Sequence, residues 1–78
     1  KAARQGHPLA QSRLAMMYSA GQGVARDNVK AHAWFNIAEA TGHQHGRNNR
    51  AMIERQMTPA EIAEARKLAR ALMAEQRP

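Results

Sequence analysis

The sequence has no cysteine and very few aromatic residues for a chain of 78 residues. Without cysteine it cannot hold a disulfide framework, a thiolate metal site or a cysteine nucleophile, and it is compatible with any redox compartment. Because there is only one Trp, one Tyr and one Phe, the core must be built mainly from Ala, Leu, Ile and Met. The many alanines favour helices that pack closely together.

Long apolar runs are also missing, and acidic residues are scarce. No stretch of about 18 apolar residues occurs, so the sequence predicts no membrane span. Twelve Lys and Arg against six Asp and Glu give a net charge of +6. Residues 1–42 hold five basic and two acidic residues, and residues 43–78 hold seven and four. This even spread indicates a general attraction for acidic partners rather than the concentrated basic face of most nucleic-acid-binding domains.

Residues 2–43 contain an ordered series of small, glycine and aromatic positions. Gly6-His7 returns as Gly42-His43 after 36 residues, and Ala2 returns as Ala38. Self-similarity at this period is typical of stacked supersecondary units. The series is Ala2, Ala3, Gly6, His7, Ala10, Gln11, Leu14, Met17, Tyr18, Gly21, Gly23, Val24, Asp27, Lys30, Ala31, Trp34, Phe35, Ala38, Gly42 and His43.

This spacing resembles the Sel1-like repeat family, a relative of the tetratricopeptide repeats. The resemblance covers one full repeat and the start of another. It implies an all-α fold, a right-handed superhelix of helix–turn–helix repeats whose first helices line an inner face, and a scaffolding or adaptor role. It divides the chain into the end of a preceding helix (1–6), a full repeat (7–42), a degenerate repeat helix (43–57) and a capping helix (58–78).

Local signals predict where the helices begin and end. Apolar spacing and helix-stop glycines place helices at about 8–20, 28–41, 44–56 and 59–76. Asp27 is a suitable N-cap, and Thr58 with Glu61 forms a capping box before the last helix. On the second helix the predicted inner stripe consists of Ala31, Trp34, Ile37 and Ala38.

The first residues predict a contact surface. Residues 1–5 have the character of the last turn of a helix, so we expect a preceding repeat in a longer array. Leu9 and the alanines at positions 2 and 3 would then expose apolar surface at this end. Such a patch tends to find a partner, and we expect weak self-association through the N-terminal end.

No residue set predicts catalysis, a metal or a cofactor. His43 and His45 would point about 200° apart on a helix and could not share a metal. We expect His7 and His43 to be solvated turn residues, and His32 to be exposed or to flank Trp34. Ser12 and Ser19 lack the strand–turn–helix setting of a nucleophile elbow, and we interpret Ser12 as a surface residue. Glu39, Glu54, Glu64 and Glu75 are expected to be helix-face charges, with Arg50 and Glu54 paired across one turn.

The sequence therefore favours a non-enzymatic binding module that holds a protein or peptide, including an acidic one, on the inner face of its first helices. The alternative is a basic helical module for nucleic acid, which a steep loss of binding with salt would reveal. Shifting the first unit by 36 residues yields two matching sets of partner-binding candidates. They are Leu9, Ser12, Arg13 and Met16, and then His45, Asn48, Asn49 and Met52.

Overall fold

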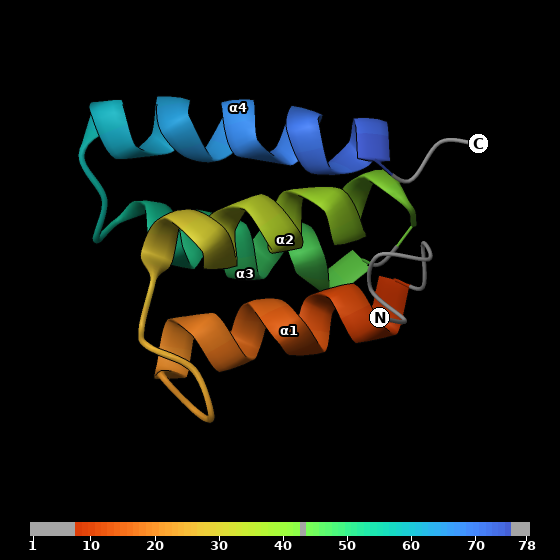
Figure 1. Cartoon of the computed structure of the whole chain (residues 1–78), viewed down its shortest axis with the longest axis horizontal. Helices are drawn as coiled ribbons and strands as arrows, with labels where there is room; N and C mark the ends of the chain where they lie inside the picture. The colour runs from red at the N-terminus through yellow and green to blue at the C-terminus, as the bar shows by residue number, and fades with distance from the viewer. Residues whose placement is uncertain (1–7, 43, 76–78) are drawn as a thin grey trace.

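A computed structural model describes residues 8–42 and 44–75, and this part of the chain is entirely α-helix and connecting turns. The helices are α1 (Pro8–Ala20), α2 (Asn28–Ala40), α3 (Gln44–Glu54) and α4 (Pro59–Glu75), shown in Figure 1. The predicted all-α fold is confirmed. Helices α2 and α3 end one and two residues before the predicted positions, a difference expected at frayed helix ends. The predicted end of the last helix at residue 76 lies outside the described residues. The helical end predicted at residues 1–5 lies outside the described residues.

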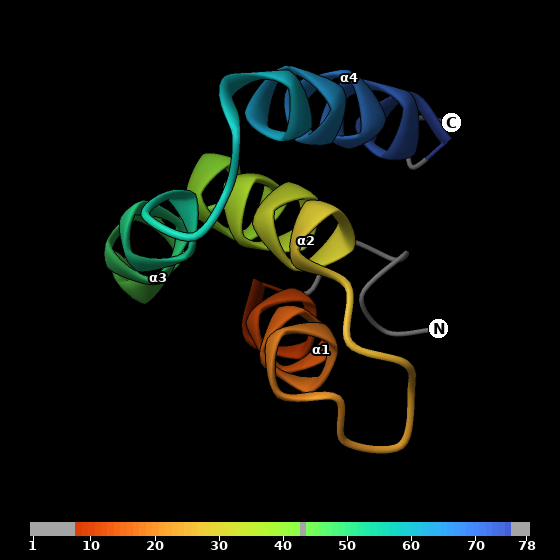
Figure 2. The ribbon, with the colours of Figure 1, turned by 90° about the vertical axis from the view of Figure 1, so that its left-hand side faces the viewer.

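Helix α2 is the central element, because it packs against α1, α3 and α4. Figure 2 looks along the bundle and shows α2 in the middle, with α4 on one side and α1 on the other. Helices α1 and α3 contact each other only slightly. The relative position of these two helices is therefore set mainly by the surface of α2 that lies between them.

The predicted capping residues make the expected hydrogen bonds. Asp27 Oδ1 accepts from the backbone N–H of Lys30 at 3.0 Å at the start of α2. Before α4, Thr58 Oγ1 accepts from the Glu61 N–H at 3.1 Å, and Glu61 Oε1 accepts from the Thr58 N–H at 2.8 Å. These bonds satisfy N–H groups that the first turn of a helix leaves without a partner. After α1, Gly21 has a φ of 72°, which favours glycine and lets the chain reverse.

The core is centred on α2 and has the composition that the sequence predicts. All four residues of the predicted inner stripe are buried, and Trp34 is only 4% exposed. Phe35, expected to flank the stripe, is 2% exposed and belongs to the same cluster. Helix α1 contributes Ala15 to this cluster, and α4 contributes Ala69 and Leu72.

Burial on α2 extends beyond the predicted stripe. An isolated helical periodicity indicates one apolar face, but α2 is covered on several sides. Ala33 and His32 are fully buried as well. The expectation that His32 is exposed or merely flanks Trp34 is therefore wrong, because the side of α2 that carries His32 is covered in the bundle.

Replacing Trp34 by alanine tests the core. Because Trp34 is almost completely buried, the substitution should lower the free energy of unfolding by about 3–5 kcal/mol. This loss is a large part of the total free energy of unfolding expected for so small a domain. Chemical denaturation followed by circular dichroism gives the value, and nearly unchanged unfolding would show that Trp34 is not part of the core.

The capping box before α4 provides a second stability prediction. Thr58→Ala should cost about 1 kcal/mol, because it removes a side-chain acceptor for the first turn. Glu61→Ala should cost less, and the double variant should lose less than the sum of the two, since both side chains serve one box. Fully additive losses in denaturation experiments would show that the two residues act independently.

Candidate partner-binding groove

Two adjoining hollows lie along α1 and α3 and form a single open groove, here called the α1–α3 groove. The first is a cavity of about 440 Å³ and the second of about 340 Å³. They share Met16, Gln22 and Asn49. The first is also lined by Leu9, Ser12, Arg13 and Met17, and the second by Ser19, Ala20, Phe35, Met52 and Ile53.

Most of the predicted partner-binding residues meet in this groove. Leu9, Ser12, Arg13, Met16 and Asn49 line the first hollow, and Met52 lines the second. Asn48 is exposed on α3 but does not line either hollow. The side chain of His45 lies outside the part that the structure describes. Their role in binding a partner stays a prediction.

Ser12 is in the groove wall but is not the surface residue that the sequence indicated. Its exposed fraction is only 3%. Neighbouring Gln11 and Ala15 are fully buried, because α1 packs closely against α2. Gln11 also reaches the end of α2, where its Oε1 accepts a hydrogen bond from the Thr41 hydroxyl at 2.8 Å. The α1–α2 pair is thus a tightly joined unit that leaves only the outer side of α1 to the groove.

Sequence reasoning missed some of the lining residues. Met17 belongs to the repeat series but not to the predicted partner-binding residues, and Gln22 lies in the turn after α1, where no periodicity applies. Phe35 and Ile53 form part of the second hollow although both also pack in or against the core. One signal was available for Met17. Two consecutive methionines on a helix must lie about 100° apart, so that together they span the core face and its edge.

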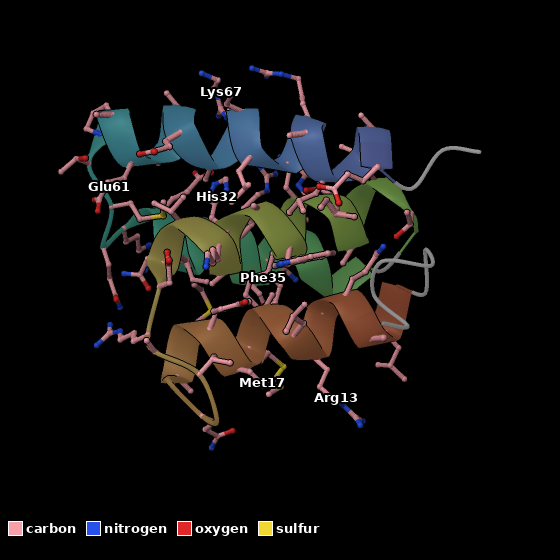
Figure 3. The ribbon with its side chains drawn as sticks, viewed as in Figure 1. Arg13, Met17, His32, Phe35, Glu61 and Lys67 are labelled. Atoms are coloured by element: carbon pink, nitrogen blue, oxygen red, sulfur yellow. The ribbon has the colours of Figure 1, made fainter. Side chains whose placement is uncertain are left out.

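The groove combines apolar surface with a single positive charge. Leu9, Met16 and Met52 are 63%, 55% and 64% exposed. Among the described residues that line the two hollows, Arg13 is the only charged one. Arg13 extends outward from α1 into solvent (Figure 3). The groove therefore offers apolar contacts and one guanidinium, which is suited to a carboxylate.

A partly buried polar contact joins α2 to α3. His32 Nε2 lies 2.6 Å from Glu54 Oε2, and the His32 side chain is fully buried. A carboxylate can only accept, so Nε2 carries the proton and donates. Nδ1 is buried without a hydrogen-bond partner in the described part of the chain. Glu54 is therefore more than the helix-face charge that the sequence indicated, because it binds a histidine 22 positions away.

Arg50 extends this contact along α3. Its guanidinium lies 3.6 Å from Glu54 Oε2, which is the predicted pair across one turn, and 2.9 Å from Glu39 Oε2 on α2. The four side chains of His32, Glu54, Arg50 and Glu39 form what we call the α2–α3 polar cluster. The hydrogen bond from His32 lowers the pKa of Glu54 more than burial raises it, and the positive charges of Arg50 and Arg66 lower it further.

Two other kinds of feature are missing from the described residues. No group of three or more His, Cys, Asp or Glu side chains there could hold a metal ion. None of the described helices is long and apolar enough to cross a bilayer.

Comparison with known proteins agrees with this architecture. Residues 8–43, which contain α1, the following turn and α2, match the model of the Sel1 repeat. A solved structure matches 96% of the chain with a TM-score of 0.91 and 34% sequence identity. Residues 8–43 of the chain are therefore a Sel1 repeat. That structure is described as c5321, a protective antigen present in uropathogenic Escherichia coli strains displaying an SLR fold, and the present chain spans 16% of its length. A search of the curated proteins finds no match.

The Sel1 match gives the polar cluster a defined place in the fold. His32 and Glu39 lie within the matched repeat, and Arg50 and Glu54 lie on the helix that follows it. The cluster therefore joins the matched Sel1 repeat to the helix that follows it. One wall of the groove belongs to the repeat and the other to α3, so the cluster helps to set their separation.

The lowered pKa of Glu54 predicts a specific dependence of stability on pH. The ordinary value is 4.5. A carboxyl group with a lower pKa in the folded state stabilises fully above its unfolded value, and this contribution disappears as pH falls through the folded value. Glu54→Gln should therefore cost about 2 kcal/mol near neutral pH, and the difference from the wild type should shrink in acid, below about pH 4.5.

Urea denaturation of both proteins from about pH 7 to about pH 3 measures this difference. Glu64→Gln is the matched control, because Glu64 is exposed on α4 and has no part in the cluster. The control should stay close to the wild type at every pH. A constant difference between wild type and Glu54→Gln across the range would contradict the proposed role of the Glu54 charge.

Proposed function

We propose that this Sel1 repeat chain is a non-enzymatic scaffold or adaptor that holds a protein or peptide in the α1–α3 groove. One observation carries the proposal. The large apolar side chains that are strongly exposed in the described part of the chain are Leu9, Met16 and Met52, and all three line the groove. Exposed apolar side chains gathered in one concave region are typical of a surface that binds another protein.

The chemistry of the lining supports a polypeptide partner. Methionine is unbranched and flexible, so Met16, Met17 and Met52 can adapt to different side chains. Ser12, Gln22 and Asn49 can form hydrogen bonds but form no arrangement with a base or nucleophile. The two hollows are open and extended rather than enclosing, which suits a segment of chain that lies along them. The scaffolding role implied by the family resemblance agrees with this chemistry.

Mutations in the groove wall test the proposal. Peptides from a random library displayed on phage would be selected on the wild-type chain, and their affinities measured on Met16→Glu and Met52→Glu. Both changes place a charge among apolar contacts. We expect groove-binding peptides to lose about tenfold or more in affinity, which corresponds to about 1.4 kcal/mol.

Ala71→Glu is the matched control, because Ala71 is exposed on α4 and lies outside the groove. It adds the same charge and should leave the affinities nearly unchanged. Peptides that bind all three variants equally would show that the groove is not the binding site. A binding constant for nucleic acid that falls steeply with salt and ignores the two methionine changes would favour the nucleic-acid alternative.

A further inference from the structure

We infer that the occupant of the α1–α3 groove is an amphipathic helix of the partner, with two apolar residues seven positions apart and an acidic residue between them. This inference rests on the proposed function and names the partner of the same groove. It follows from three properties of the groove wall, which are the spacing of its apolar side chains, the scarcity of free hydrogen-bonding groups and the position of its charge.

The apolar spacing along α1 matches a helix. Leu9 and Met16 are seven residues apart on one helix, which places them about 10.5 Å apart along its axis. A partner helix lying alongside presents its residues i and i+7 on one face at the same spacing. An extended segment repeats same-face side chains at about 6.6 Å or about 13 Å, so its apolar residues would not coincide with both Leu9 and Met16.

The hydrogen-bonding groups of the groove point to the same occupant. Its walls are helices whose own N–H and C=O groups are used within each helix. A bound extended segment would have to satisfy its backbone largely through Gln22 and Asn49, since Ser12 is almost completely buried. A helix satisfies its backbone internally and needs only side-chain contacts, as in other complexes that place an amphipathic helix in a groove.

The positive charge of Arg13 on α1 determines which kind of residue the partner helix should carry between its two apolar positions. Arg13 lies four residues after Leu9 and three before Met16, so it is between them on the same side of α1. It makes no ion pair with any residue in the described part of the chain. A carboxylate at position i+3 or i+4 of the partner helix would lie opposite its guanidinium and form a charge-assisted hydrogen bond.

The opposite wall completes the site. Met52 is 64% exposed on α3, and Asn49 borders both hollows. A flexible thioether and an amide on this side can pack against the flank of a bound helix without demanding one particular residue there. The specificity of the groove therefore lies in the α1 wall, in the order apolar, acidic, apolar.

A designed peptide tests this arrangement directly. It has about 18 residues, mostly Ala and Gln so that it is helical, with Leu at positions i and i+7 and Glu at i+3 and i+4. With glutamate at both positions, one of them lies opposite Arg13 whether the peptide runs parallel or antiparallel to α1. Fluorescence anisotropy measures its affinity for the full chain. The control peptides carry Lys in place of Glu, or the same residues rearranged so that the leucines alternate with polar residues.

We expect the designed peptide to bind the wild type and to lose about three- to tenfold in affinity on Arg13→Glu. The lysine peptide should show the opposite preference and bind Arg13→Glu more tightly than the wild type. Arg70→Glu is the matched control, because Arg70 is exposed on α4 and the charge change is identical. It should alter the affinity by less than about twofold. Circular dichroism of each variant verifies that the fold is retained.

Several results would overturn the inference. Equal losses on Arg13→Glu and Arg70→Glu would show attraction by net charge alone. Equally tight binding of the rearranged peptide would exclude the helix. Failure of the designed peptide to bind, while library peptides still depend on Met16 and Met52, would reject the helical pattern and leave the proposed function standing. A library without any groove-dependent peptide would reject both.

Discussion

The hydrogen bond between His32 and Glu54 is the interaction on which the geometry of the groove depends. The two walls of the groove, α1 and α3, scarcely touch each other, so their separation follows from how each packs on α2. Apolar contacts such as those of Phe35 and Ile53 stabilise α3 against α2 but tolerate small shifts along it. A directional contact of 2.6 Å between a fully buried imidazole and a carboxylate tolerates little displacement, and it fixes α3 in one register.

The polar cluster is better suited to specificity than to large net stabilisation. Bringing the charges of Glu54, Arg50 and Glu39 out of water costs free energy that their attraction only partly offsets. Each member of the cluster is matched to a partner on the facing helix or across one turn. An alternative register of α3 would leave the buried His32 ring opposite groups that cannot accept its proton. The cluster thus penalises wrong arrangements of the two helices, as a coiled-coil polar residue does for its register.

Local features of the fold could be predicted from the sequence because their causes are local. The caps at Asp27 and Thr58 and the stop at Gly21 involve residues a few positions apart, and the helices follow from them. The 36-residue shift also identified Met52 as the counterpart of Met16, and both residues line the second hollow. The burial of His32 could not be predicted this way, because it depends on α3 lying against α2 and on a partner 22 residues away. The position of Gln22 in the groove lining could not be predicted for a different reason, because the periodicity of a helix does not extend to a turn residue.

The core residues and the residues proposed to bind a partner lie on different surfaces of the same helices. Trp34, Ile37 and their neighbours on α2 form the core, whereas the exposed Leu9, Met16 and Met52 contribute little to it because most of their surface is in solvent. Substitutions at these positions change the lining of the groove and leave the core contacts in place. Since the α2–α3 polar cluster sets the separation of the walls independently of their outer side chains, one scaffold can present different lining residues at a constant spacing. Under the proposed function, the choice of partner would reside in the lining residues of the groove rather than in the fold that carries them.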